Sequence, residues 1–325
     1  MAVQDFVPYE KLVFNLRAMG MSIFNSKAAI DYLVDYTSFS VIEGHSNLFF
    51  DSTNPRHYKN GTSFAEIQAL HHFDETLRRS LTHYVLRVET IVRGNAVYAF
   101  CNAKDLYGCF LHSPNGYLDI ANYDQNRKYD AAKAIEIFRE VLEQGLRTPG
   151  PIQRWRKSHD GCIPLLVAAT GMSFGHTLKF VRALKPSERE AVAKRFSLHE
   201  QELVNFMSVL RDFRNVLAHS GSVYSFRTIH RIRGILCADG TMERVEESSN
   251  RLFGSVLFIL KHLLPKRDFS SLINELSTLF CGLSEKLHTI SSLDVARVMG
   301  IPSSMRTRYG LKMCRHPRKT VLQAD

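Results

Sequence analysis

The sequence lacks the closely spaced cysteine pairs that mark zinc sites and small disulfide-rich folds. The chain has 325 residues, and its six cysteines lie far apart without a C-x-x-C pair. In a chain of this length, such cysteines are typical of reduced and mostly buried thiols in a cytosolic protein. We therefore expect neither a metal site nor a cofactor. The cysteines are Cys101, Cys109, Cys162, Cys237, Cys281 and Cys314.

Long hydrophobic runs are also missing. The most apolar run, residues 252–264, contains Lys261 and His262 and is too short to cross a bilayer. The first residues have neither the basic region nor the apolar stretch of a secretory signal, and the chain has no repeat or low-complexity tract. With 45% hydrophobic residues, the sequence predicts a soluble cytoplasmic protein with one large core or two smaller ones and no membrane partner.

Acidic residues are in the minority, since 42 basic side chains face 32 acidic ones and the formal net charge is +10. Such a balance favours polyanion partners, although many basic proteins bind none. Residues 303–323 carry no acid, and Tyr309 and His316 lie among their cations. This mixture suits phosphate contact and base stacking, but a solvated basic tail is the commoner explanation. The candidate RNA-binding residues are Arg211, Arg306, Arg308, Lys312, Arg315, Arg318 and Lys319.

Strand signals are few, and only residues 238–241 are suited to turn a short hairpin. The apolar spacing is helical nearly throughout, so the fold class is predicted to be all-α. We expect three regions: an N-terminal extension over 1–60, a helical domain over 61–303 and the basic tail over 304–325. Expected helices after the first long one cover 128–144, 163–184 with breaks at Gly171 and Gly175, 187–196, 197–219, 249–264 and 268–287.

The first long helix opens with a capping box formed by Ser63 and Glu66. One apolar stripe follows, and the opposite face is charged. That face holds two acid–arginine pairs with a spacing of four residues, which makes them helix neighbours. The pairs are Asp74 with Arg78, and Glu89 with Arg93.

The helix expected over 197–219 begins at a second capping box, Ser197 with Glu200, and ends in the hexapeptide RNVLAH, residues 214–219. Asn215 and Asp212 share a helix face with His219. The Ser-Gly-Ser that follows is a helix stop, with Gly221 suited to a left-handed cap. His219 would then lie at the negative end of the helix dipole, where a protonated imidazole is favoured.

An arginine that holds phosphate and a histidine that moves protons are groups that cleave RNA without a metal. The spacing alone is weak, because Arg78 with His83 and Arg154 with His159 repeat it. Arg214 and His219 lie roughly 140° apart on an ideal helix, so one copy converges poorly and two copies across a two-fold axis would complete the site. The plainer alternative is a histidine that caps carbonyls and an arginine paired with an acid on a neighbouring helix.

The hexapeptide resembles the Arg–Asn–x–x–Ala–His signature of the HEPN superfamily of RNases and nucleotide-binding domains. More narrowly, the chain resembles the abortive-infection AbiD/AbiF-like family over roughly residues 36–302, and the blocks follow the order found in that family. The blocks are 39–45 with Gly44 retained, 61–64, 73–74, 77–78, 88–93, Pro164, 172–175, 210–219 and 299–302. The resemblance implies a HEPN-like helical bundle with additional helices and a small N-terminal extension.

The chain also departs from the family pattern. Ser220 stands where the family commonly has a second histidine, and 222–226 replaces an Arg-Leu-x-Asn-Arg block beginning at Ser222. The arginine of the N-terminal block is replaced near Val41. Arg214, Asn215 and His219 remain, so these departures affect substrate positioning rather than the proposed chemistry.

The resemblance implies a metal-independent endoribonuclease of phage defence or toxin type that is active as a homodimer on RNA. It also implies a structured non-coding RNA as partner, either as antitoxin or as guide. His219 would transfer protons, Arg214 would stabilise the charged phosphorus centre, and Asn215 would orient one or the other. The expected products are a 2′,3′-cyclic phosphate and a 5′-OH. The supporting candidates are Asp212, Glu89, Arg93 and Tyr224.

Three other functions remain open from the sequence. The first is a non-catalytic HEPN-like module that binds RNA or a nucleotide. The second is a DNA-binding regulator that uses residues 293–306 as a helix-turn-helix. The third, a serine hydrolase using His219 with Ser220 or Ser222, lacks a nucleophile elbow.

Overall fold

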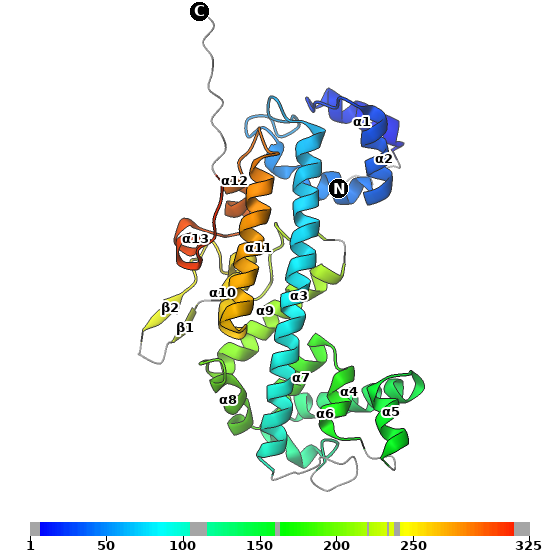
Figure 1. Ribbon diagram of the computed structural model, residues 1–325, viewed down its shortest axis with the longest axis vertical. Helices are drawn as coiled ribbons and strands as arrows, with labels where there is room; N and C mark the ends of the chain where they lie inside the picture. The colour runs from blue at the N-terminus through cyan, green and yellow to red at the C-terminus, as the bar shows by residue number, and fades with distance from the viewer. Residues whose placement is uncertain are drawn as a thin grey trace, which may run out of the picture.

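The fold is all-α, as predicted, and is organised around one long central helix. The computed structural model describes residues 7–104, 116–159, 163–219, 221–232, 234–236 and 241–314. Helix α3 (Phe64–Asn102) runs most of the length of the molecule, and α11 (Lys266–Ser284) lies alongside it (Figure 1). Because α3 also contacts α7, α8, α9 and α10, residues far apart in the sequence meet along its sides.

The remaining elements group at the two ends and along one side of α3 (Figure 1). The N-terminal layer holds α1 (Tyr9–Ala18), α2 (Ser26–Tyr36) and the short turns η1 (Phe39–Glu43) and η2 (Asn47–Phe49). The opposite end holds η3 (Ile120–Asn122), η4 (Gln125–Arg127), α4 (Lys128–Arg147), α5 (Pro151–Ser158), α6 (Leu165–Ala168), η5 (Ala169–Gly171) and α7 (Phe174–Ala183). The rest comprises α8 (Pro186–Lys194), α9 (Glu200–Ala218), β1 (Gly234–Leu236), β2 (Met242–Arg244), α10 (Phe253–Leu263), α12 (Ser292–Val298) and α13 (Ser303–Tyr309).

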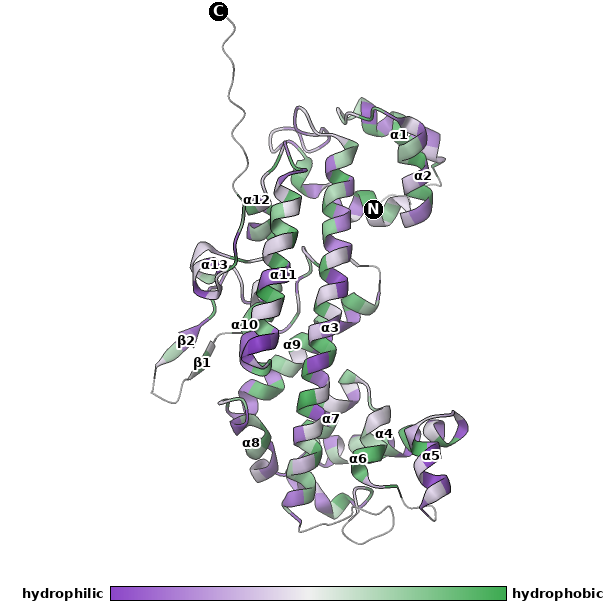
Figure 2. Cartoon of the chain, in the orientation of Figure 1, coloured by the Kyte–Doolittle hydropathy of each residue, from purple (hydrophilic) through white to green (hydrophobic). Residues whose placement is uncertain are grey.

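The hydrophobic core follows α3 from end to end, and hydrophobic and hydrophilic residues alternate along α3 and α11 (Figure 2). The most apolar run of the sequence forms α10, which is buried on nearly all sides. Gly254 of α10 approaches Gly300 so closely that a Cβ on Gly254 would overlap the Gly300 carbonyl oxygen. Among the described residues, none of the helices combines the length and apolar character needed to traverse a bilayer.

Several predicted helix boundaries hold and others shift for local reasons. The Ser63–Glu66 capping box is confirmed. The second box is wrong: Ser197 adopts φ +57°, the helix begins at Glu200, and the backbone N–H of His199 donates to the Glu202 carboxylate at 2.8 Å. The predicted left-handed cap at Gly221 is also wrong, because the described residues with positive φ do not include it.

The middle of the chain contains more breaks than its apolar spacing predicts. Helix α4 continues past Gly145 and ends at Arg147. Ile152 packs so closely against Gly145 that a side chain at position 145 would collide with it. Helix α5 follows three residues after the end of α4 and was not predicted. The interrupted helix expected over 163–184 is divided into α6, η5 and α7, and of the two expected breaks only the one at Gly171 matches. The predicted hairpin is present as β1 and β2, and its turn residues 237–240 lie outside the described residues.

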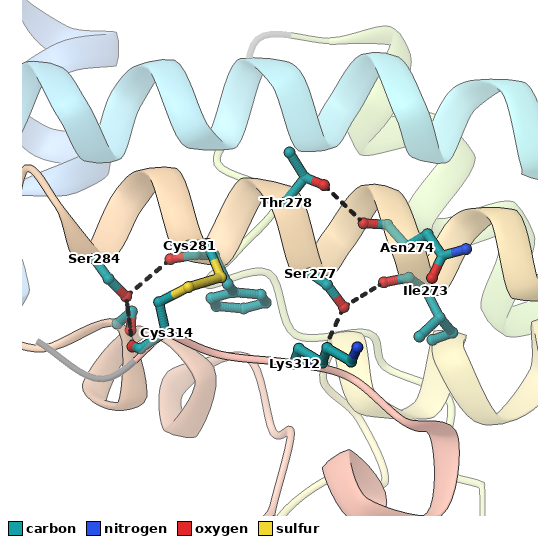
Figure 3. The surroundings of a disulfide bond; sticks show 10 residues. Ile273, Asn274, Ser277, Thr278, Cys281, Ser284, Lys312 and Cys314 are labelled. Carbon is teal, nitrogen blue, oxygen red and sulfur yellow. Dashed lines mark hydrogen bonds between the residues drawn. A yellow bond between two sulfur atoms is a disulfide. The ribbon is translucent and has the colours of Figure 1, made fainter.

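The prediction of six reduced thiols is wrong for one pair, because Cys281 and Cys314 form a disulfide. This bond ties the basic tail to α11 at Cys314 (Figure 3). The Lys312 N–H donates to Ser277 Oγ at 3.0 Å and the Ser284 hydroxyl donates to the Cys314 carbonyl at 3.3 Å, so polar contacts hold the same junction. The spacing in sequence, 33 residues, gave no indication of the pairing. Cys109, Cys162 and Cys237 lie outside the described residues, and Cys101 is half-buried in the last turn of α3.

Candidate active site at the end of α9

Helix α9 brings Arg214 to α3, where the acid of one predicted surface pair is in fact buried. Glu89 is only 7% exposed, so its pairing with Arg93 is not a solvent-facing one. Burial raises the pKa of the Glu89 carboxyl above its ordinary value, and the charges of Arg93 and Arg214 partly offset that rise. Arg214 is half-buried and acts on Glu89 through its charge without a direct ion pair within the described residues.

Arg93 joins this group to the start of α7. Its Nη1 donates to Glu89 Oε1 at 2.9 Å and to the carbonyl of Met172 at 3.1 Å. Met172 directly precedes Ser173, whose hydroxyl caps the first turn of α7. Arg93 therefore connects the buried carboxyl of Glu89 on α3 to the residue two positions before α7.

His219 and Asn215 present their side chains to solvent at the end of α9. His219 is the C-cap residue in an extended conformation, and its backbone N–H donates to the Asn215 and Val216 carbonyls. Within the described residues, neither side chain makes a hydrogen bond or ion pair. An exposed imidazole next to an exposed amide is accessible to a substrate, and the described residues contain no group of three or more potential metal ligands.

The other acid–arginine pair of α3 holds the chain that carries His219. Arg78 donates to the His219 carbonyl at 3.0 Å and to the Gly221 carbonyl at 2.5 Å. Asp74 accepts the backbone N–H of Val223 at 3.0 Å and that of Tyr224 at 2.6 Å. We call this set of contacts the Asp74–Arg78 clamp. Sequence reasoning placed this pair on a charged outer face, although Asp74 is 1% exposed.

Two buried histidines surround the clamp on the side of the N-terminal layer. His45 Nε2 lies 3.6 Å from Asp74 Oδ2, and its ring stacks on Tyr224. Burial, reinforced by the charge of His45, lowers the pKa of His71 to about 4, while Asp74 acts in the opposite direction. The N-terminal layer thus packs against the clamp through His45. The sequence did not indicate His45 or His71, because isolated histidines carry no motif. A cavity of about 250 Å³ opens beside these side chains.

The supporting candidate Tyr224 belongs to this buried cluster rather than to the exposed surface. It is 1% exposed, and its hydroxyl donates to the Gly44 carbonyl at 3.3 Å. Burial raises the pKa of its phenol, with Asp74 adding to the effect. The structure therefore gives Tyr224 a packing role behind the loop.

Asp212 shares the α9 face of His219, as expected, but its carboxylate is already occupied. Thr228 Oγ1 donates to it at 2.6 Å and His230 Nδ1 lies 2.7 Å away, while Arg211 reaches the other oxygen at 3.2 Å. Burial favours a higher pKa for Asp212, but the contacts from Thr228, His230 and Arg211 hold it below the ordinary value. Arg211 is thus paired within the protein, and His230 is a polar partner that the sequence did not indicate.

The family model for Abi-like proteins matches residues 31–225. The matched range is more than half of the chain and contains the Gly44 block, all of α3 and the Arg214–His219 hexapeptide. The chain belongs to the Abi-like protein family. Membership suggests a part in abortive infection, a form of phage defence. No curated protein and no solved structure matches the chain.

The departures of this Abi-like protein from the expected pattern fall beside the clamp. Val41 is fully buried in η1, and Ser222 accepts a hydrogen bond from the Ser225 hydroxyl at 3.0 Å. Ser220 lies outside the described residues.

The basic segment of the Abi-like protein is partly engaged in its own fold. Arg308 pairs with Glu243 at 3.2 Å, and the half-buried Arg306 directs Nη1 toward the sulfur of Met313. Tyr309 makes an edge-to-face contact with Phe269, with the ring centroids 5.4 Å apart. Arg308 and Lys312 are exposed, and Arg315, Arg318 and Lys319 lie outside the described residues.

Residues 293–306 form parts of two short helices, α12 and α13, joined at a turn around Gly300. The turn packs into the core, because the Met299 carbonyl accepts the N–H of Gly254 at 2.9 Å. The second helix is anchored by buried Met305 and carries Arg308 in its pair with Glu243. Through these contacts, residues 293–306 pack into the fold of the Abi-like protein.

Proposed function

We propose that this Abi-like protein is a metal-independent endoribonuclease that acts in phage defence or as a toxin, with Arg214 and His219 at its active site. The observation that carries the proposal is the exposed, unengaged imidazole of His219, fixed through its own backbone by Arg78. A histidine that only stabilises a helix end would direct its ring to the carbonyls, whereas the carbonyl here is held by another residue. Arg214 lies five residues before His219 on the same helix, close enough to Glu89 for its charge to act on that carboxyl.

The proposed reaction is an internal phosphoryl transfer. A base takes the proton of a ribose 2′-OH, whose oxygen attacks the adjacent phosphorus, and the bond to the 5′ oxygen breaks. An acid protonates that leaving oxygen, which gives a 2′,3′-cyclic phosphate and a 5′-OH. His219 carries out the proton transfers, Arg214 stabilises the extra negative charge at phosphorus, and Asn215 orients the imidazole or a phosphate oxygen.

We propose that two copies of the chain complete the site. Arg214 lies toward α3 and Glu89, whereas the ring of His219 lies beyond the last turn of α9. A homodimer that joins the ends of two α9 helices would place the arginine of one subunit near the histidine of the other. The same proposal includes a structured non-coding RNA as inhibitor or guide, for which the surplus of basic residues supplies the charge complement.

The test is cleavage of a DNA oligonucleotide that contains one ribose. Wild-type protein should cut only after that ribose, and EDTA should leave the rate unchanged. His219→Ala and Arg214→Ala should each lower the rate at least about 100-fold, since each removes a group that acts on the transition state. Arg154→Ala, which removes an exposed arginine on α5, is the matched control and should cut normally.

The same assay separates the nuclease from its main rival, a non-catalytic RNA-binding module. Intact oligonucleotide together with retained RNA binding would favour the rival. Cleavage that EDTA abolishes would point to a metal-dependent reaction and contradict the role of His219. On expression in cells, His219→Ala and Arg214→Ala should each relieve growth inhibition. The purified variants should keep the helical circular dichroism spectrum of the wild type.

The basic segment is proposed to contact RNA phosphates through Lys312 and the residues that follow the disulfide. Neutralising Arg315, Arg318 and Lys319 together should make the salt dependence of RNA binding shallower, by about 0.7 in logarithmic slope for each lost phosphate contact. An unchanged slope would show that the segment is passive.

A further inference from the structure

Along α9 lies a cavity of about 250 Å³ whose lining contains three arginines, a histidine and one acid, Glu200. Helix α9 supplies one wall. The other wall is formed by Arg127 of η4, Arg182 of α7 and Arg189 of α8. Its lining residues include Arg127, Arg182, Arg189, Asn205, Ser208 and His230. Three guanidinium groups and an imidazole around one small cavity suit an anion.

His230 is held in one orientation at this cavity. Its Nδ1 lies 2.7 Å from Asp212 Oδ2, and the Thr228 hydroxyl donates to the same oxygen at 2.6 Å. The backbone N–H of His230 donates to Thr228 Oγ1 at 3.1 Å, which closes the turn. A carboxylate that accepts the Nδ1–H leaves Nε2 as the free ring nitrogen, and a positioned imidazole of this kind binds phosphate oxygens when it is protonated.

The arginines differ in how far protein acids neutralise them. Buried Arg189 pairs with Asp124 at 3.0 Å and Glu200 at 2.6 Å, and Arg127 also lies near Asp124. Arg182 is the exception, because within the described residues its guanidinium contacts no carboxylate and its Nη2 donates to Ser208 Oγ at 3.1 Å. The uncompensated charge of the cavity is therefore that of Arg182, directly opposite α9.

The cavity and His219 share one face of α9. Ser208, Asp212, Asn215 and His219 follow at intervals of four, three and four residues, which align on a helix. At 1.5 Å per residue, Ser208 and His219 are roughly 16 Å apart along the axis. A single strand that follows this face would reach both places with different phosphates.

We propose that this cavity binds a phosphate group of an RNA strand, with Arg182 as the main cation and His230, oriented by Asp212, as the second contact. Phosphate binding here is independent of cleavage, whereas the alignment with a scissile bond at His219 rests on the proposed function. The shared ligand chemistry is a phosphate dianion or diester, and the experiment distinguishes a free phosphate compound from a polynucleotide.

The experiment is a calorimetric titration of the full chain with inorganic phosphate, with AMP and with a 2′-O-methyl RNA 12-mer that cannot be cleaved. Arg182→Gln and His230→Gln should each weaken binding of the 12-mer about tenfold, and Arg182→Gln should make the salt dependence shallower by about 0.7 in logarithmic slope. Arg154→Gln removes the same charge from exposed α5 and should change the affinity less than twofold.

Three results overturn the proposal. Equal affinities of all variants for the 12-mer would show that no RNA phosphate occupies the cavity. Loss of phosphate or AMP binding with an unaltered 12-mer would assign the site to a small phosphate compound. An equal loss in Arg154→Gln would reduce the effect to net charge. Because the 12-mer is uncleavable, a failure of the nuclease proposal leaves these readouts intact, and thermal unfolding checks that each variant is folded.

Discussion

Helix α3 carries two acid–arginine pairs with the same spacing, and the structure uses them differently. Asp74 with Arg78 and Glu89 with Arg93 are both neighbours on one helix. Asp74 accepts two backbone N–H groups, and Arg78 donates to two carbonyls, so this pair holds the loop after His219. Glu89 accepts from Arg93 alone among the described residues, in surroundings that raise its pKa.

The difference shows what a helical spacing can and cannot say. Four residues of separation bring the two side chains of each pair together whatever surrounds them. Which pair clamps a loop depends on chain segments about 150 residues later, such as Val223 and Tyr224. The Asp74 carboxylate accepts two backbone N–H groups from a distant segment, whereas the Glu89 carboxyl accepts from an arginine of its own helix.

The largest expected effect comes from breaking the clamp. Asp74→Ala should lower the free energy of unfolding by about 3–5 kcal/mol, because it leaves two buried N–H groups without an acceptor and Arg78 without its acid. It should also abolish growth inhibition by releasing the His219 loop. The neighbouring Glu75→Ala is the control and should cost less than about 1 kcal/mol. Urea unfolding measures both, and equal stabilities would contradict the clamp.

A smaller effect concerns the histidine behind the clamp. Because the pKa of His71 is about 4 in the fold and the ordinary value is 6.5, the fold favours the neutral ring. Its contribution is fully present above pH 6.5 and is lost as the pH falls toward 4, which amounts to about 2 kcal/mol between pH 7.5 and pH 5. The lowered pKa of His71 already includes the effects of three charged groups near the ring, His45, Asp74 and Arg78.

The readout for His71 is the difference between wild type and His71→Gln in urea unfolding at the two pH values. The variant cannot titrate at this position, so its stability should fall by about 2 kcal/mol less than that of wild type. Parallel losses in the two proteins would show that His71 does not contribute to acid sensitivity.

The smallest effect belongs to the Glu89 pair and sharpens the comparison. Glu89→Gln should change the free energy of unfolding by less than about 1 kcal/mol at pH 7, because the amide keeps the size and an acceptor for Arg93. The raised pKa means that wild type loses stability as the pH rises through the titration of Glu89, and the variant should lack that slope. A loss as large as that of Asp74→Ala would remove the distinction between the pairs.

The all-α class, the first capping box and the course of α3 were predictable because they depend on local patterns. The start of α9 was not, since left-handed Ser197 moves the cap two residues along the chain. At the candidate site, the hexapeptide was recognisable, but the partners of Asp212 were not, because Thr228 and His230 come from a loop without periodicity. The Cys281–Cys314 bond also depends on tertiary proximity alone.

The central claim is that two subunits bring Arg214 and His219 to a shared RNA phosphate, and mixing variants tests it most directly. Arg214→Ala and His219→Ala should each be inactive alone. When they are co-expressed, about half of the dimers are mixed and retain one intact arginine opposite one intact histidine, so cleavage of the single-ribose oligonucleotide should return to a substantial fraction of the wild-type rate. Activity of the mixture no higher than that of either variant would contradict the shared site.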